Sequence, residues 1–308
     1  MSYDLIIIGG GPAGVTAGIY ASRKKINTLL IAKEFGGSWV VSDKIENFIG
    51  FKSIPGVELA RALEEHLRSQ AEPIEIKEGV FVVAIKKTNA GFEVATSDGA
   101  AYQTKTILFA LGSGYRKLNV PGEKEYEGKG VFYCSTCDAP LMKGKKAAVI
   151  GGGNSGLEAA IDLLPYASEI YVLERDSALK GDAIYQETLK KDPKVKIFID
   201  VETKEISGDG FVTGFKYADL KTNEIKSVDV SGIFVAIGYR PNTDLVKDLV
   251  NINEKGEIIV DHKTFQSSLK GIWAVGDAAD GLYNQFNTAI GDAVNATLNI
   301  YDSFKSGI

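Results

Sequence analysis

The amino-acid sequence predicts an α/β protein built from two Rossmann-type (three-layer) units, and two observations lead to this class. A short apolar run, a glycine-rich turn and a helical pattern follow one another twice, at residues 5–25 and from residue 147 onward. Each time, a stretch that alternates like antiparallel strands comes later in the unit. The chain is therefore internally duplicated, and its 308 residues exceed what one hydrophobic core usually fills.

The elements of the first unit follow from its periodicity. Leu5 to Ile8 is predicted as a strand, VTAGIYASRKK as a helix and NTLLIAK as a second strand. In SIPGVELARALEEHLRSQ, Leu59, Leu63 and Leu67 recur every four residues, which predicts an amphipathic helix with a stripe for the core or a dimer contact. Residues 78–112 then alternate like antiparallel strands, with turns at NAG and SDG.

The second unit repeats this order. Ala147 to Ile150 is predicted as a strand, Leu157 onward as a helix, and SEIYVLER as a further strand. Residues 194–238 form the second antiparallel stretch. The carboxyl end from Gly256 has a predicted strand pair and a closing helix, but no glycine fingerprint, so it is too incomplete for a third domain.

Composition and charge exclude several classes of protein. With 44% hydrophobic and 24% charged residues, the chain is neither disordered nor fibrous. A net charge of −5 without a Lys/Arg cluster argues against nucleic-acid partners. No stretch reaches the roughly 18 apolar residues of a membrane span, and the first apolar run is interpreted as a strand. Two cysteines are too few for a disulfide scaffold, so we expect a cytoplasmic protein.

Both glycine turns fit a dinucleotide-binding fingerprint, G-x-G-x-x-G between a strand and a helix. The first glycine permits the tight turn, the second lets the backbone approach a pyrophosphate, and the third lets the helix pack on the strand. A glycine-rich turn of an unrelated α/β fold is the alternative for one copy, but two copies make it a poor explanation. The glycines are Gly9, Gly11 and Gly14 in GGGPAG, and Gly151, Gly153 and Gly156 in GGGNSG.

The acidic residue expected to bind the adenosine ribose differs between the two units. Glu174 ends the strand EIYVL and lies 23 residues after Gly151, close to the roughly 20 expected. Its carboxylate would repel a 2′-phosphate. In the first unit Glu34 follows the strand a little late, so its ribose contact stays open.

The motifs together resemble the low-molecular-weight thioredoxin reductases and the related flavoprotein subunit of alkyl hydroperoxide reductase. The resemblance covers essentially the whole chain. It is carried by GGGPAG (9–14), IENFIGF (45–51), YCSTCD (133–138), GGGNSG (151–156), GYRPNT (238–243) and WAVGDAAD (273–280).

The resemblance implies two nucleotide-binding domains, the second inserted into the first. Residues 1–114 and 245–308 would form a split FAD-binding domain, and residues 115–244 a pyridine-nucleotide-binding-like domain that carries the cysteine pair. Asp277 would hold the ribityl chain of the flavin, and Asn47 would approach its ring. The implied cofactor contacts are Gly9, Gly11, Pro12, Ala13, Gly14, Glu34, Gly37, Ser38, Asn47, Gly112, Gly276, Asp277, Gln285 and Phe286 for FAD, and Gly151, Gly153, Asn154, Ser155, Gly156 and Glu174 for the nucleotide.

Several positions depart from the pattern of the family. NADPH-dependent members carry a basic His-Arg-Arg cluster where this chain has Glu174, Arg175 and Asp176, so NADH is favoured over NADPH. Ser38 and Trp39 replace a usual glutamine, and Asn284 a frequent arginine or lysine. Trp39 is interpreted as a cover for the flavin or as a core aromatic. Relatives with such changes include members that use NADH and members that use ferredoxin or a deazaflavin.

The pair Cys134 and Cys137 has the two-residue spacing that brings sulfurs together at a turn or helix start. A zinc site needs about four ligands, and besides these the chain has only His66 and His262, which are interpreted as surface residues, so no metal site is predicted. Two inert buried thiols, or the CxxC of a thioredoxin fold, fit this context less well. By resemblance, Cys137 faces the flavin, Cys134 attacks the disulfide of the substrate protein, and Asp138 is the general acid and base.

The leading hypothesis is therefore an FAD-dependent thioredoxin-disulfide reductase, by resemblance a homodimer. Electrons would pass from NADH or NADPH through FAD and the Cys134/Cys137 disulfide to thioredoxin or a thioredoxin-like protein. The same reductase driven by ferredoxin or another donor is the close alternative. A ferredoxin–NADP reductase of this architecture lacks the CxxC motif, and a simple FAD-binding module would need no dithiol.

Overall fold

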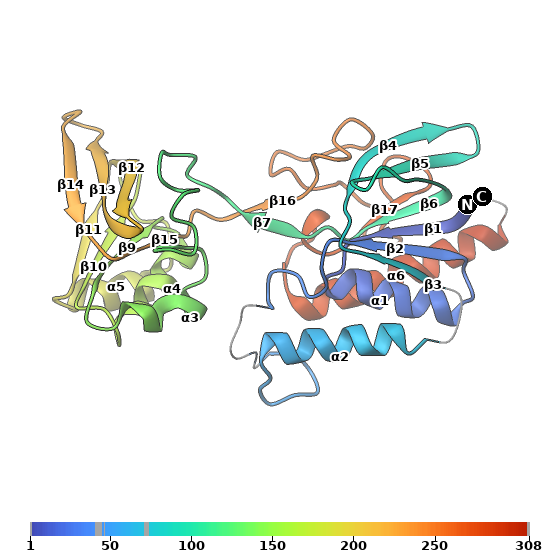
Figure 1. The fold of residues 1–308 in the computed structure, drawn as a ribbon, viewed down its shortest axis with the longest axis horizontal. Coiled ribbons are helices and arrows are strands. Elements are labelled where there is room, and N and C mark those ends of the chain that lie inside the picture. The colour runs from blue at the N-terminus through green and yellow to red at the C-terminus, as the bar shows by residue number, and fades with distance from the viewer. Residues whose placement is uncertain (1, 41–44, 46, 71–73, 307–308) are drawn as a thin grey trace. The chain divides into compact units, whose positions relative to one another are not determined.

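The computed structural model describes residues 2–40, 45, 47–70 and 74–306, apart from the side chain of Cys137. The chain folds into two compact units, with unit 1 formed by Met1–Gly114 and Arg240–Ile308 and unit 2 by Tyr115–Tyr239 (Figure 1). The second junction thus lies five residues before the expected boundary at 244/245. Strand β16 (Tyr239–Pro241) pairs with β7 (Ser113–Tyr115) in a two-stranded sheet. The two segments in which the chain passes from one unit to the other are therefore paired with each other.

Unit 1 is built on a seven-stranded sheet. Its strands are β1 (Ser2–Ile8), β2 (Thr28–Ala32), β3 (Ile74–Glu78), β4 (Val82–Thr88), β5 (Gly91–Thr96), β6 (Ala101–Phe109) and β17 (Ile272–Ala274). Their order is β3-β2-β1-β6-β5-β4, with β17 also paired to β6. The first half of β6 pairs antiparallel with β5 and its second half parallel with β17, which brings the carboxyl-terminal segment of the chain into the sheet.

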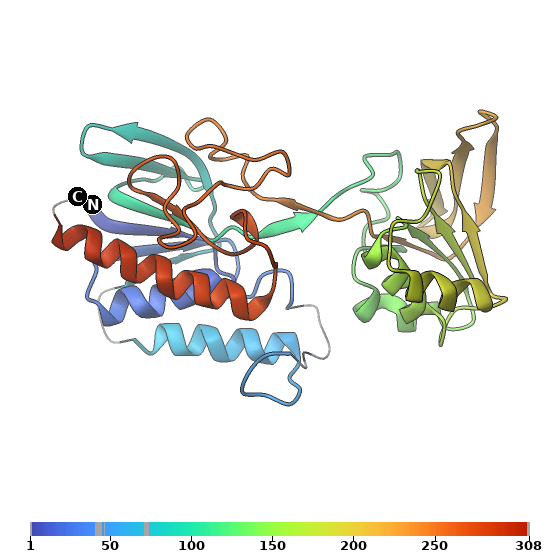
Figure 2. The ribbon, with the colours of Figure 1, turned by 180° about the vertical axis from the view of Figure 1, so that it is seen from behind.

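Three helices cover one face of this sheet, as both views of the ribbon show (Figures 1 and 2). They are α1 (Pro12–Arg23), α2 (Gly56–Arg68) and α6 (Phe286–Lys305). In α2, Leu59 and Leu67 are buried and Leu63 is partly buried, so the predicted leucine stripe packs into the core. In α6 the buried side is largely alanine, at 289, 293 and 296. Small residues let α6 lie close to its neighbours.

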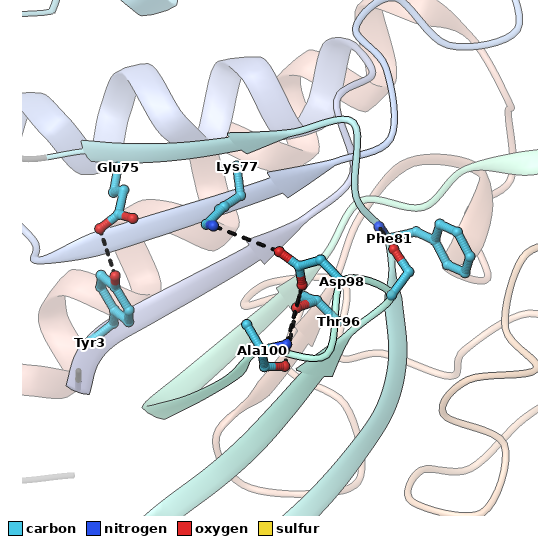
Figure 3. A network of polar contacts seen from close by, with 8 residues as sticks. Tyr3, Glu75, Lys77, Phe81, Thr96, Asp98 and Ala100 are labelled. Carbon is cyan, nitrogen blue, oxygen red and sulfur yellow. Dashed lines mark hydrogen bonds and ion pairs between the residues drawn. The ribbon is translucent and has the colours of Figure 1, made fainter.

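Polar contacts tie the outer strand β3 to the turn between β5 and β6 (Figure 3). Tyr3 donates a hydrogen bond to Glu75 at 2.7 Å, and the ammonium group of Lys77 lies 3.7 Å from Asp98. The hydroxyl of Thr96 and the N–H of Ala100 both donate to Asp98. These two hydrogen bonds lower the pKa of Asp98, and the bond from Thr96 has the larger effect. These contacts thus link β3 to β1 and to the turn between β5 and β6.

Unit 2 is built on a five-stranded parallel sheet of order β11-β10-β9-β15-β8. These strands are β8 (Val131–Phe132), β9 (Lys146–Ile150), β10 (Glu169–Leu173), β11 (Val195–Phe198) and β15 (Gly232–Val235). Helices α3 (Ser135–Asp138), α4 (Asn154–Leu163) and α5 (Ala183–Lys191), with the short 3-10 turn Ala139–Met142, cover one face (Figure 1). The antiparallel strands β12 (Val201–Asp209), β13 (Phe211–Asp219) and β14 (Ile225–Asp229) cover the other.

The alternation along β9 explains the three layers of unit 2. Ala147 and Val149 belong to the cluster with the helices, whereas Ala148 and Ile150 belong to the cluster with the antiparallel strands. A strand buried on both faces must be apolar throughout, as AAVI is. The predicted α/β class with Rossmann-type units is confirmed.

Several elements differ from the sequence expectations. Helix α1 begins at Pro12 and not at Val15. Strands β11 and β15, expected within the antiparallel stretch 194–238, pair parallel with their neighbours. Helix α4 begins at Asn154, directly after the glycine turn, and not at Leu157. The expected strand pair near the carboxyl end was wrong. Among the described residues there, β17 is the single strand, and Ile258 and Val260 make isolated bridges. Helix α5 was not predicted. Within the described residues, no helix is long and apolar enough to cross a membrane.

Candidate functional site

The first glycine turn joins β1 to α1, and its three glycines have different reasons to be glycine. Gly9 has φ +123°, and a Cβ there would lie 2.2 Å from the carbonyl oxygen of Ala110. A Cβ at Gly14 would lie 1.9 Å from the carbonyl oxygen of Gly9. At Gly11, in contrast, no described protein atom lies within 4 Å of a Cβ. The turn therefore keeps room beside the N-terminus of α1, where Pro12 and Ala13 begin the helix, as a pyrophosphate requires.

The second glycine turn, between β9 and α4, has the same geometry. Gly151 has φ +124°, and a Cβ on Gly156 would lie 2.0 Å from the carbonyl oxygen of Gly151. A Cβ at Gly153 has no described protein atom within 4 Å. Asn154 and Ser155 begin α4 and are exposed, and the side-chain oxygen of Asn154 accepts a hydrogen bond from the N–H of Asp182 at 2.7 Å. The loop before α5 is thus attached to this turn.

The two acidic residues lie beside their turns in different ways. Glu174 follows β10, and its carboxylate accepts hydrogen bonds from the N–H of Gly152 at 2.6 Å and of Asp176 at 2.8 Å. Glu34 is exposed, and a Cβ on Gly10 would lie 2.4 Å from the main-chain carbonyl oxygen of Glu34. The carboxylate of Glu174 is therefore fixed at the edge of the turn, where a ribose would follow a bound pyrophosphate.

The segment after β2 borders the first turn. Gly36 donates its N–H to the carbonyl of Gly10 at 3.0 Å, and a Cβ on Gly37 would lie 3.5 Å from the Cα of Gly11. Exposed Ser38 follows. The ring of Trp39 packs edge-on against Phe286 at 4.5 Å, yet its Nε1–H is buried without a hydrogen-bond partner among the described residues. A buried donor of this kind calls for a polar partner, which a bound cofactor would supply.

The N-terminus of α6 lies beside the segment around Asn47. The carbonyl of Asn47 accepts a hydrogen bond from the side chain of Asn287 at 2.8 Å, and its side-chain nitrogen lies 3.5 Å from the side-chain oxygen of Gln285. Gln285 also caps α6 in a capping box with Thr288. The structure thus brings Asn47, Gln285 and Phe286, three predicted contacts from distant parts of the sequence, to one place.

The turn after β17 positions Asp277. The hydroxyl of Ser113 donates to its carboxylate at 3.0 Å. A Cβ on Gly276 would lie 3.3 Å from the Cβ of Ala289 and 3.8 Å from that of Ala13, so this turn lies between α6 and α1. Burial raises the pKa of Asp292, which also accepts a hydrogen bond from the N–H of Gly276.

Gly112 adopts φ +61° at the end of the neighbouring segment, and its carbonyl accepts a hydrogen bond from the N–H of Asn242 at 3.0 Å. Because Ser113 follows directly and bonds Asp277, Gly112 lies next to the predicted ribityl contact. The predicted FAD contacts Gly9, Gly112 and Gly276 therefore lie just after β1, β6 and β17, and β6 pairs with both of the other strands.

The cysteine pair lies at the end of β8. Cys134 is half-buried and disulfide-bonded, and it is the N-cap residue of the short helix α3. Asp138, also half-buried, donates its N–H to the carbonyl of Cys134 at 3.2 Å. The predicted role of Cys137 concerns a side chain outside the described part of the structure.

Unit 2 gathers its candidate residues at one edge. Cys134 follows β8, the glycine turn follows β9, and Glu174 follows β10, and these strands run parallel in one sheet. The carboxyl ends of parallel strands are the usual place for ligands in such sheets. The dithiol and the dinucleotide fingerprint therefore lie at the same edge of the same sheet.

Three tyrosines for which the sequence predicted no role form a cluster that begins directly before Cys134. The rings of Tyr133 and Tyr239 lie 5.6 and 5.1 Å from that of Tyr115. Burial, with the nearby Tyr239, raises the pKa of Tyr115 to about 12. Tyr133 and Tyr239 lie in the motifs YCSTCD and GYRPNT, and these motifs were the signals in the sequence that could have pointed to this cluster.

Comparison with known proteins agrees with this geometry. The family model for "Pyridine nucleotide-disulphide oxidoreductase" matches residues 3–293. An alkyl hydroperoxide reductase subunit of Pseudomonas aeruginosa is 43% identical over 303 residues, which are 98% of this chain and 58% of that protein. NADH dehydrogenase of Bacillus subtilis is 42% identical over 300 residues, 97% of this chain and 58% of that protein. This chain thus spans less than two thirds of the length of these relatives.

Solved structures give a match along the full length. The crystal structure of T. acidophilum thioredoxin reductase aligns with a TM-score of 0.80 and 37% identity and covers 99% of both chains. The resemblance inferred from the motifs is therefore confirmed at the level of fold and family.

Proposed function

Since this chain belongs to the pyridine nucleotide-disulphide oxidoreductase family, we propose that it is a disulfide reductase that passes electrons from a nicotinamide nucleotide through FAD and the Cys134 disulfide to a thioredoxin-like protein. One observation carries this proposal: a disulfide-bonded cysteine lies at the same sheet edge as a dinucleotide-binding turn. FAD and NAD(P)H are the cofactors that membership of the family implies.

The residues of unit 1 fit FAD. The room beside Gly11 would accept the pyrophosphate, and the buried Nε1–H of Trp39 and the carboxylate of Asp277 are polar groups that a dinucleotide of this kind would satisfy. When bound, FAD supplies the two-electron chemistry between the nucleotide and the disulfide.

The cysteines would then perform thiol–disulfide exchange. The reduced pair holds two electrons and two protons more than the disulfide. The Cys134 thiolate attacks one sulfur of the partner disulfide, so that a mixed disulfide forms and a partner thiolate leaves. The Cys137 thiolate then attacks Cys134, which releases the second partner thiolate and restores the disulfide. Asp138 would accept and return the protons of these steps.

NADH is the donor that the site favours. Glu174 presents a carboxylate fixed by two backbone N–H groups, which suits ribose hydroxyls and opposes a 2′-phosphate. Arg175, the nearest cation in sequence, lies 3.4 Å from Glu202 and is thus already paired. Ferredoxin or another reductant remains the alternative donor.

A peroxide-reducing protein with its own disulfide is a second candidate partner. The observation that favours it is the 43% identity to the alkyl hydroperoxide reductase subunit of Pseudomonas aeruginosa. The exchange chemistry at Cys134 is the same for either partner, so the two candidates differ in the surface that docks and not in the reaction.

Replacement of Cys134 by serine tests the proposal. The FAD-loaded C134S variant should keep the rate at which NADH bleaches the flavin, because the nucleotide and flavin sites are untouched, and should lose reduction of thioredoxin. Stopped-flow absorbance measures the first step, and release of thioredoxin thiols measures the second. Thioredoxin reduction at the wild-type rate in C134S would contradict the proposal.

A further inference from the structure

The residues on both sides of Cys134 are each hydrogen-bonded to a carboxylate. The hydroxyl of Tyr133 donates to Glu123 at 2.9 Å, and the hydroxyl of Ser135 donates to Asp162 at 2.7 Å. The two carboxylates come from different places, because Glu123 lies in the loop before β8 and Asp162 lies on α4. Both residues that flank the half-buried Cys134 are therefore bonded to acidic groups.

Glu123 fixes the residue that precedes Cys134. Its side chain is only 4% exposed, and it also accepts the N–H groups of Leu118 at 2.8 Å and Asn119 at 2.7 Å. Burial and the bond to Glu123 raise the pKa of Tyr133 far above its usual value, so the phenol stays a neutral donor. The ammonium group of Lys117 lies 3.7 Å from the centre of the Tyr133 ring.

Asp162 fixes the residue that follows Cys134. It is half-buried on α4, the helix that begins at the second glycine turn, and Ser135 is the first residue of α3. Successive Cα atoms lie about 3.8 Å apart, so a carboxylate bonded to Ser135 lies within about one Debye length of Cys134. At such a distance we expect its charge to act on the sulfur chemistry.

We propose that Asp162, through Ser135, and Glu123, through Tyr133, are positioning residues that hold Cys134 in a negative environment and so make its dithiol a stronger reductant. The inference rests on the proposed function. The disulfide is neutral, whereas the reduced pair becomes anionic as it ionises, so neighbouring carboxylates disfavour the reduced state. Electrons then leave the dithiol more readily for the disulfide of a partner.

Other charged groups around α3 belong to this environment. Asp138 lies on α3 itself, with Tyr115 near it. On α4, which packs against α3, Glu158 is exposed and is hydrogen-bonded to Tyr185 of α5. The following 3-10 turn, APLM, carries no titratable side chain. Among the described residues, Lys117 is one neighbouring cation, and it is paired with Glu127 at 2.6 Å. Lys143 follows the 3-10 turn.

The test is a redox equilibrium with glutathione, in which the protein disulfide and two glutathione thiols exchange with the protein dithiol and one glutathione disulfide. The FAD-loaded protein is equilibrated between pH 6 and 9, and alkylated Cys134 is counted by mass spectrometry. At pH 9 the D162N variant should shift the equilibrium toward the dithiol by about three- to ten-fold, because one charge is removed. The shift should shrink toward pH 6, where the thiols are protonated.

Matched variants separate charge from structure. S207A removes a hydroxyl that bonds within the antiparallel layer of unit 2 and should leave the equilibrium unchanged. The shift that D162N causes in the equilibrium should be at most half as large when S135A is also present, because without the Ser135 hydroxyl the Asp162 carboxylate is no longer fixed beside Cys134. Y133F tests the second contact, and a shift in the same direction is expected.

The inference would be overturned if D162N had the same equilibrium as the wild-type protein at every pH, or if its shift did not change with pH. Neither result would affect the proposed function. A wild-type Cys134 disulfide that glutathione cannot reduce in the folded protein would overturn the proposed function as well.

Discussion

Single glycines distinguish what the fold requires from what a nucleotide requires. Gly14 cannot carry a side chain, because its Cβ would overlap the carbonyl of Gly9. Gly11 and Gly153 have φ −75° and −81°, which any residue adopts, and no described protein atom lies within 4 Å of a Cβ at either position. The fold itself therefore does not require glycine at these two positions, which is what we expect of glycines that leave room for a nucleotide.

Valine at these two positions gives the first prediction. G11V should weaken FAD binding by about thirty-fold or more, or about 2 kcal/mol, and leave the stability of the FAD-free protein nearly unchanged. G153V should retain FAD but lose reduction by NADH. Flavin absorbance after gel filtration and urea unfolding measure both effects. The two variants control for each other, and equal FAD loss in both would contradict the assignment.

The carboxylate of Glu174 gives the second prediction, at the same scale. The value of kcat/KM should be roughly thirty- to a hundred-fold higher with NADH than with NADPH. With NADPH the hydrogen bonds between Glu174 and the ribose would be lost and a repulsion from the 2′-phosphate gained, which together cost about 2–3 kcal/mol. E174Q should reduce this ratio about ten-fold. E187Q, on the exposed surface of α5, is the matched control and should not change it. A preference of the wild-type protein for NADPH would show that Glu174 does not select the nucleotide.

Residues whose role depends on local spacing could be predicted from the sequence, and residues whose role depends on tertiary partners could not. The glycines and Glu174 follow from short patterns beside strands. Asp162 lies 27 residues from Ser135, and Ser113 lies 164 residues from Asp277. Their hydrogen bonds exist only because the sheet brings distant segments together.

At the scale of elements, the same contrast holds. The helix around Leu59 was predictable because its stripe matches the helical period, and the antiparallel pairing of β4, β5 and the first half of β6 was predictable from the alternation. The parallel pairing of β6 with β1 and β17 was not predicted from residues 78–112. The predicted strand pair near the carboxyl end failed because Ile258 bridges to both Ile252 and Ala279, so its hydrogen bonds are divided between partners that periodicity does not reveal. Helix α5 was missed because its one buried side chain, Leu189, gives no stripe.

Charges across the first residues of β9, β10 and β11 give the third prediction. The pKa of Glu169 is about 2, below its usual 4.5, because Lys196 and then Tyr171 donate hydrogen bonds to its carboxylate. Lys146 adds a smaller effect. Because the folded pKa is the lower one, this stabilisation is complete above about pH 4.5 and is lost as the pH falls toward 2. E169Q should therefore destabilise unit 2 by about 1 kcal/mol at pH 7, a value that already allows for solvent screening of the exposed lysines. The destabilisation should become smaller as the pH falls.

Hydrogen exchange of the β9 and β10 amides measures this effect within unit 2 alone. E187Q again serves as the control. A difference between E169Q and the wild-type protein that stays constant from pH 7 to pH 3 would contradict the electrostatic account.

At the scale of the whole molecule, the chain is a duplicated architecture with different chemistry in its two halves. Unit 1 has a glycine turn, a buried indole N–H and an aspartate fixed by Ser113. Unit 2 has the second turn, the fixed Glu174 and the disulfide-bonded Cys134 at one sheet edge. The two crossings between the units are the paired strands β7 and β16. The proposed reductase needs both units, because unit 1 fits FAD and unit 2 carries the disulfide-bonded Cys134.

The central claim is that electrons from a nicotinamide nucleotide reach Cys134. The most direct measurement is anaerobic incubation of the FAD-loaded protein with NADH, followed by rapid alkylation and mass spectrometry of the peptide that contains Cys134. The account predicts that Cys134 becomes alkylated in the wild-type protein, and that it stays protected in G153V and in samples without NADH. A flavin that NADH fully bleaches while Cys134 remains disulfide-bonded would contradict it.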